Sequence, residues 1–107
     1  MDKATHKIVA EYIRLAQKSY PEIIDVYIFG SYASDNAKEE SDIDLALIFN
    51  QLEDQNRFDV QVKLMLIASQ VDSRIEPHPI SAEDFKAGNP FVEEIKKNGY
   101  PIIEDAI

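Results

Sequence analysis

Residues 26–50 constrain the fold of this chain more than any other part of the sequence. The stretch reads VYIFGSYASDNAKEESDIDLALIFN and contains two apolar runs separated by a polar connector. Short apolar runs rich in β-branched and aromatic residues are typical of buried strands. We therefore expect one strand to end just before Gly30 and a second strand to carry the acidic pair Asp42 and Asp44.

The remaining sequence predicts helices and further strands around these two runs. Apolar residues recur at helical spacing before the first run and after the second. The expected elements are a helix over 3–19, a strand over 23–29, a short helix over 32–37 capped by Ser31, a strand over 41–49, a helix over 58–70, a strand over 73–80, a turn of helix at 81–84, a helix over 90–98 and a strand over 100–103. This order predicts a single α/β (α+β) domain over 1–107, a small mixed β-sheet flanked by helices.

Two patterns refine this arrangement. Pro77 and Pro79 each remove a backbone donor, so that end of the third strand should lie at an edge of the sheet. The helix over 58–70 carries two apolar stripes, one of Phe58, Val62, Met65 and Leu66 and one of Val60, Leu64, Ile67 and Val71. We expect the sheet to cover one stripe. Core packing, a second copy of the chain or a partner protein could cover the other.

Composition argues against several classes of function. The chain carries 20 Asp and Glu against 11 Lys and Arg, so a broad nucleic-acid-binding face is not expected. It has no cysteine and only the histidines His6 and His78, which argues against disulfides, thiolate chemistry and zinc. The N-terminus lacks the apolar core of a signal peptide, and no long apolar run occurs. We expect a soluble, cytoplasmic protein.

The acidic pair indicates a metal site. Side chains alternate along a strand, so Asp42, Asp44 and Ala46 should share one face. Two carboxylates so close together are costly unless a cation compensates them, and such oxygen ligands suit Mg²⁺ or Mn²⁺. Taken alone, the same spacing also fits a solvent-facing edge strand.

Gly30 and Ser31 supply the complementary half, a place for phosphate. Glycine at a strand end lets a phosphate approach the backbone closely, and a helix N-terminus at Ser31 would present free N–H groups. Taken alone, a Gly-Ser pair is also common in turns.

Together, Gly30-Ser31, ten intervening residues and Asp42-Ile43-Asp44 resemble the signature of the DNA polymerase β nucleotidyltransferase superfamily, and most closely that of its minimal, MNT-type members. The resemblance covers most of the chain, and it implies a polymerase β palm-like fold with a third acidic residue on the next strand. Glu76 and Asp72 are available, and we choose Glu76 because it lies within the strand. Glu76 could instead be a surface partner of a basic residue such as Arg74.

The resemblance also implies an activity. Asp42, Asp44 and Glu76 would be catalytic and hold Mg²⁺, while Gly30 and Ser31 would bind the phosphates of ATP. Minimal members typically pair with helical HEPN proteins, which they adenylylate on tyrosine or bind as antitoxins in a toxin–antitoxin system. A HEPN-type partner is therefore implied, since the roughly thirty residues after the third strand are too few for an acceptor domain. A non-catalytic binding antitoxin and a stand-alone transferase acting on a small hydroxyl compound are the alternatives.

Three further residues have two interpretations each. His78 could touch substrate or be structural, and Lys38 could reach phosphate or lie in solvent with Glu39 and Glu40. Tyr32 could stack on a base or pack against the short helix.

Overall fold

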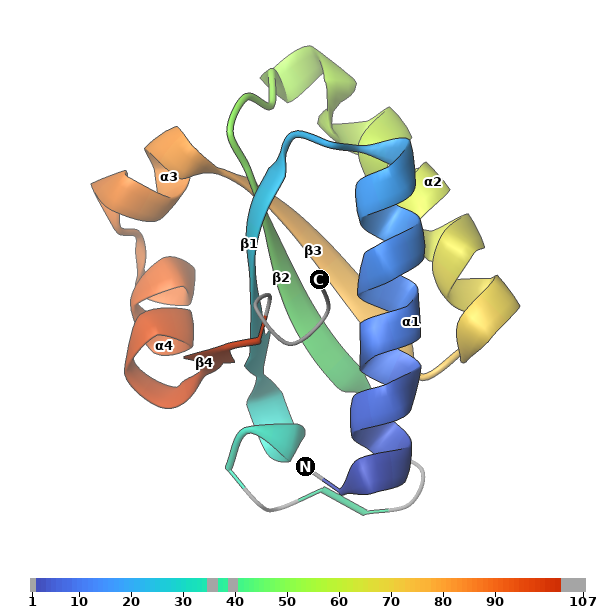
Figure 1. Ribbon diagram of the computed structural model, residues 1–107. Coiled ribbons are helices and arrows are strands. Elements are labelled where there is room, and N and C mark those ends of the chain that lie inside the picture. Colours follow the sequence, from blue (N-terminus) through green and yellow to red (C-terminus); the bar gives the residue numbers. More distant parts are fainter. Residues whose placement is uncertain (1, 35–36, 39–40, 103–107) are drawn as a thin grey trace.

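The computed structural model describes residues 2–34, 37–38 and 41–102, and it contains a four-stranded sheet with helices on both faces (Figure 1). The elements are α1 (Lys3–Ser19), β1 (Ile23–Phe29), the 3₁₀ turn η1 (Gly30–Tyr32), β2 (Ile43–Phe49), α2 (Asp54–Val71), β3 (Ile75–Ser81), α3 (Ala82–Ala87), α4 (Pro90–Asn98) and β4 (Tyr100–Pro101). The strand order is β3-β2-β1-β4; β2 and β3 are parallel, and the other pairs are antiparallel. The mixed sheet flanked by helices confirms the predicted architecture.

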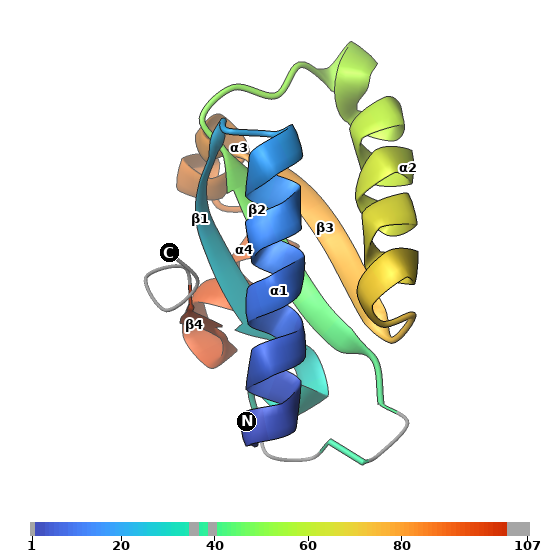
Figure 2. The same ribbon diagram turned by 45° about the vertical axis from the view of Figure 1, so that its right-hand side comes forward.

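Helices α1 and α2 pack on one face of the sheet (Figure 2). Their buried side chains meet those of the strands in the larger core cluster, to which β1 and β2 contribute Ile23, Val26, Ile28, Ile43, Leu45, Leu47 and Phe49. The hydroxyl of Tyr12 on α1 donates to the backbone carbonyl of Leu64 on α2 over 3.1 Å, which ties the two helices together. None of the helices in the described part of the chain combines the length and apolar character that a membrane span requires.

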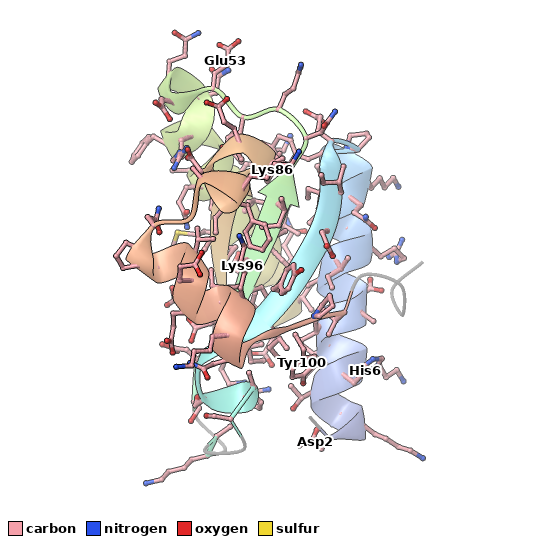
Figure 3. All side chains as sticks on the ribbon, turned by 90° about the vertical axis from the view of Figure 1, so that its left-hand side faces the viewer. Asp2, His6, Glu53, Lys86, Lys96 and Tyr100 are labelled. Atoms are coloured by element: carbon pink, nitrogen blue, oxygen red, sulfur yellow. The ribbon has the colours of Figure 1, made fainter. Side chains whose placement is uncertain are left out.

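Helices α3 and α4 pack on the opposite face, which Figure 3 views with Lys86 and Lys96 labelled on them. Their smaller core cluster contains Phe29, Ala46, Ile48, Ile80, Val92 and Ile95. Both helices begin at a side-chain cap. The Ser81 hydroxyl accepts from the Asp84 N–H over 3.0 Å, and the Asn89 side chain accepts from the Val92 N–H over 2.9 Å.

Several boundaries differ from the prediction. Strand β2 begins at Ile43, so Asp42 lies just before it and not within it. Helix α2 begins at Asp54, earlier than predicted. Its first turn is polar, so apolar periodicity did not reveal that turn. Strand β3 covers Ile75–Ser81. The last strand is confirmed for Tyr100–Pro101, and residue 103 lies outside the described residues.

The prediction of a short helix over 32–37 is wrong. The helical turn is Gly30–Tyr32, and Ser31 lies inside it instead of capping it. Gly30 has a φ of 75°, so the chain bends at the glycine itself. Residues 35–36 of the predicted helix, and Glu39 and Glu40 of the predicted solvent segment, lie outside the described residues.

The two predicted stripes of α2 have different environments. Val60, Leu64 and Ile67 are buried against the sheet, whereas Phe58, Val62, Met65 and Leu66 are exposed. We call these four exposed residues the outer stripe. Exposure reaches 75% for Phe58 and 59% for Leu66, so core packing does not cover this side of the helix. The edge position of β3, predicted from Pro77 and Pro79, is confirmed by the strand order.

Candidate functional site

Gly30 and Asp44 lie against each other where β1 ends and β2 begins. The turn η1 lies beside the start of β2 (Figure 1), and Phe29 pairs with Asp44 across the antiparallel ladder. A Cβ built on Gly30 would overlap the Oδ2 atom of Asp44 and lie 3.2 Å from its Cγ atom. Because Gly30 has no side chain, the Asp44 carboxylate can occupy the space that a Cβ would fill.

Asp44 and Glu76 are neighbours on adjacent strands. They are Cα partners in the parallel ladder between β2 and β3. Residues two apart in a strand share a face, so Asp44 lies on the face of Ala46, which packs in the α3–α4 cluster. Glu76 is half-buried, and its carboxylate has no hydrogen bond to any residue in the described ranges. Gly30, Asp44 and Glu76 therefore follow one another from β1 to β3.

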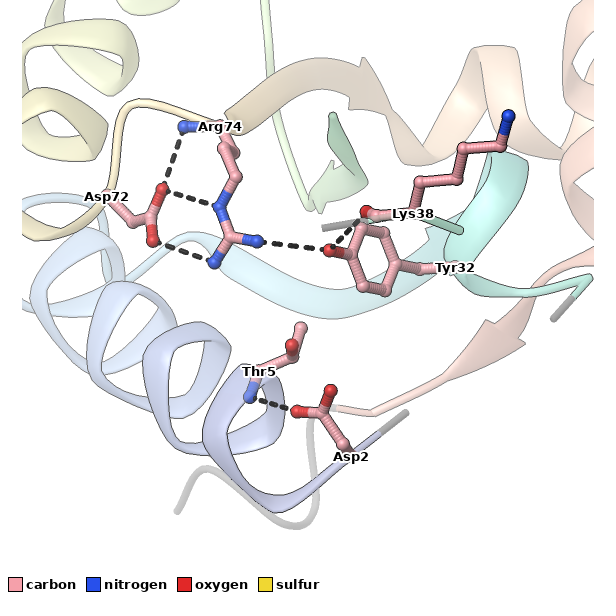
Figure 4. A network of polar contacts seen from close by, with 6 residues as sticks. All are labelled: Asp2, Thr5, Tyr32, Lys38, Asp72 and Arg74. Atoms are coloured by element: carbon pink, nitrogen blue, oxygen red, sulfur yellow. Dashed lines mark hydrogen bonds and ion pairs between the residues drawn. The ribbon is translucent and has the colours of Figure 1, made fainter. Parts of the chain in front are cut away.

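Asp72, the other possible third acid, is already engaged by Arg74 (Figure 4). The Nε and Nη2 atoms of Arg74 donate to its two carboxylate oxygens over 3.1 and 2.9 Å. These hydrogen bonds lower the pKa of Asp72 below its usual value. Among the described residues, Arg74 thus holds the carboxylate of Asp72, and Glu76 stays the predicted third acid.

Tyr32 belongs to the same network and packs in the core. It is buried in the α1–α2 cluster, its hydroxyl accepts from Arg74 Nη1 over 3.1 Å, and it donates toward the Lys38 carbonyl (Figure 4). This arrangement favours the packing interpretation of Tyr32 over base stacking. Lys38 itself is exposed, as expected for a solvated lysine.

Asp42 and Ser31 lie next to these residues in the chain, just before β2 and just after Gly30. Asp42 is exposed, and Ser31 is half-buried within the turn. Within the described ranges, no group of three or more His, Cys, Asp or Glu side chains gathers closely enough to hold a metal. Asp42, Asp44 and Glu76 thus lie at one end of the sheet without forming a closed cage.

His78 and two phenylalanines form the part of this region that sequence reasoning did not assemble. The Nε2 atom of His78 lies 3.4 Å from Oδ1 of Asp44. The ring centroids of Phe29 and Phe91 lie 5.1 and 5.7 Å from that of His78, distances typical of aromatic contacts. Phe91 comes from α4, where its side chain is 44% exposed, and no local pattern in the sequence indicates its contact with His78.

Solved structures share this fold. A candidate nucleotidyltransferase from Sulfolobus solfataricus is 22% identical, with a TM-score of 0.64 over 90% of this chain and 77% of that one. A toxin–antitoxin complex with AMP-PNP is 21% identical, with a TM-score of 0.58 over 91% and 77%. A tri-AMPylated Shewanella oneidensis HEPN toxin with its MNT antitoxin is 20% identical, with a TM-score of 0.55 over 94% and 76%. At such identities the likeness establishes the fold.

Among curated proteins, no sequence matches the chain significantly. The family model described as Polymerase beta, Nucleotidyltransferase matches residues 11–106, which is most of the chain. The chain therefore belongs to the polymerase beta nucleotidyltransferase family.

Proposed function

We propose that this protein is a Mg²⁺-dependent nucleotidyltransferase that moves AMP from ATP to a tyrosine hydroxyl of a helical HEPN-type partner and thereby acts as an antitoxin. Membership of the nucleotidyltransferase family supports the transfer reaction. The toxin–antitoxin complexes of the same fold, one with AMP-PNP and one with an AMPylated HEPN toxin, support the donor and the partner.

The observation that carries the proposal is the contact between Gly30 and Asp44. A glycine with a φ of 75° is placed where any side chain would displace the Asp44 carboxylate. This arrangement places the backbone of the turn directly beside an acidic group, which suits a phosphate held next to a carboxylate-bound cation. The neighbouring Glu76 extends the same acidic row toward β3.

The residues present fit Mg²⁺. All three acidic side chains offer oxygen, and Mg²⁺ commonly uses one or two protein carboxylates together with substrate phosphates, so a closed protein cage is not required. Asp42, Asp44 and Glu76 would hold it. When bound, the ion would neutralise charge on the triphosphate and on the leaving pyrophosphate.

The chain's own residues then position the reactants. Backbone N–H groups of the turn and the Ser31 hydroxyl bind the β- and γ-phosphates. The tyrosine oxygen attacks the α-phosphorus, the bond from that phosphorus to the bridging oxygen breaks, and pyrophosphate departs on the opposite side. The Glu76 carboxylate accepts the phenolic proton and returns it to solvent.

The outer stripe of α2 is also compatible with a second candidate, neutralisation by contact alone. Four exposed apolar side chains on one helix offer a protein-binding surface whether or not AMP is transferred. A stand-alone transferase acting on a small hydroxyl compound gains no comparable support from the described residues.

Incubation with α-labelled ATP, Mg²⁺ and a HEPN-type helical protein that binds this chain separates the two candidates. Transfer predicts that the partner gains the mass of AMP and loses toxicity, and that Asp42→Asn with Asp44→Asn abolishes both effects. Asp59→Asn, an exposed acid on α2, is the matched control and should label at the wild-type rate. If the partner gains no mass, or if the double variant still labels it, the enzymatic proposal fails. Neutralisation that survives the double variant would favour contact.

A further inference from the structure

We propose that the acceptor tyrosine enters a hollow at the β3 edge of the sheet, where Phe91, His78 and Arg57 surround its ring. The inference rests on the proposed function and assigns it a second binding site within the same chain. The hollow has a volume of about 170 Å³ and is walled by side chains of α2, β3 and α4.

The order of groups across the sheet fixes the side from which an acceptor can attack. The turn at Gly30 lies on the β1 side of Asp44, and Glu76 lies on the β3 side. The attacking and leaving oxygens of phosphoryl transfer stand roughly in line. With pyrophosphate held at Gly30, the attacking oxygen must therefore approach from the β3 side.

The hollow lies on the β3 side, and His78 connects it to the carboxylate of Asp44. Its walls include His78 and Pro79 of β3, and Phe91 near the start of α4. The His78 ring also lies 3.4 Å from Asp44, as measured from Nε2 to Oδ1. One side chain thus borders both the hollow and the carboxylate at which the nucleotide would bind.

The walls suit an aromatic ring. Phe91 is 44% exposed, and its centroid lies 5.7 Å from that of His78 and 5.5 Å from that of Phe29, so a fourth ring can extend this cluster. Arg57, which also lines the hollow, donates from Nη2 to the carboxylates of Asp54 and Asp84 over 3.1 and 3.0 Å. A guanidinium fixed at its edge keeps its planar face for stacking on a ring.

The surface beside the hollow suits a protein carrying that ring. Successive residues of an α-helix are rotated by about 100° around its axis. This rotation places Arg57 and Gln61 between the buried stripe of α2 and the edge of the outer stripe formed by Met65 and Phe58. A partner helix lying on the outer stripe would therefore reach the hollow directly. This continuity favours a tyrosine presented by a protein over a free small compound.

Titration of the whole chain with N-acetyl-tyrosinamide, followed by NMR of the aromatic side chains, tests the assignment without requiring catalysis. We expect the ring signals of Phe91 and His78 to shift, and Phe91→Ala to weaken binding roughly three- to tenfold. Ile24→Ala, a 51% exposed apolar residue on β1, is the control and should bind as wild type does. Equal affinities for the two variants, or shifts confined to other residues, would overturn the assignment. Adenosine that moves the same signals and displaces the probe would overturn it too, because the hollow would then hold the base.

The transfer assay separates this inference from the proposed function. If both hold, Phe91→Ala raises the KM for the partner while the affinity for ATP stays within about twofold. Ring shifts at the hollow without AMP transfer by the wild-type protein would count against the proposed function alone. Transfer by the wild type without any shift at Phe91 or His78 would overturn the hollow assignment alone.

Discussion

Replacing Gly30 by alanine should damage stability and activity for two separable reasons. The φ of 75° is strained for alanine by about 1–3 kcal/mol, which lowers the melting temperature by about 4–8 °C for each kcal/mol. The new Cβ would also overlap Oδ2 of Asp44 and lie 3.2 Å from Cγ, so the carboxylate must rotate away. A displacement of about 1 Å at a reacting group can cost about 100-fold in rate. We expect a loss of AMP transfer of that order.

Gly88→Ala is the matched control. Gly88 has a φ of 72°, and a Cβ there would lie 2.6 Å from a carboxylate oxygen of Glu93, an exposed residue of α4. Urea unfolding should show similar destabilisation of both variants, whereas the transfer rate, measured with labelled ATP below both melting temperatures, should fall only for Gly30→Ala. Equal transfer rates in the two variants would refute the argument that the glycine makes room for the catalytic carboxylate.

Three further predictions concern stability and binding. Hydrogen bonds from Arg74 lower the pKa of Asp72, so Asp72→Asn should destabilise the protein at neutral pH. The difference in urea midpoint between this variant and the wild type should vanish as the pH falls below 3.8 and through the lowered pKa of Asp72. A difference that stays constant with pH would contradict this prediction. Tyr12→Phe should cost about 1 kcal/mol in urea unfolding, because it removes the donor to a buried carbonyl of α2. Phe58→Ser with Leu66→Ser should change stability by no more than about 0.5 kcal/mol per site but weaken partner binding in calorimetry, since both side chains are exposed; unchanged affinity would argue against the outer stripe as a contact.

Local signals predicted the elements that are punctuated in the sequence. Helix α4 has the predicted ends because Asn89, Pro90 and Gly99 fix its cap, first turn and stop. Strand β1 also has its predicted bounds, from Ile23 to Phe29. The start of α2 was missed because its first turn is polar and is held as helix without an apolar pattern.

The candidate site likewise combines features that local patterns predicted with features that they did not predict. Alternation along a strand predicted the face of Asp44, and the parallel register then paired Asp44 with Glu76. The bend at Gly30 and the proximity of Phe91 to His78 depend on how distant segments pack, which no local pattern encodes. The arginine that engages Asp72 was likewise assigned only by its contacts in the structure.

The transfer rate of Glu76→Gln, measured beside Asp72→Asn, tests most directly whether Gly30, Asp44 and Glu76 form one transfer site. Both variants replace a half-buried carboxylate by an amide of nearly the same shape. With the proton-accepting carboxylate lost, Glu76→Gln should transfer AMP at least about 100-fold more slowly at saturating ATP, whereas Asp72→Asn should stay near the wild-type rate wherever it is folded. A wild-type rate for Glu76→Gln, or a loss of transfer confined to Asp72→Asn, would contradict the account.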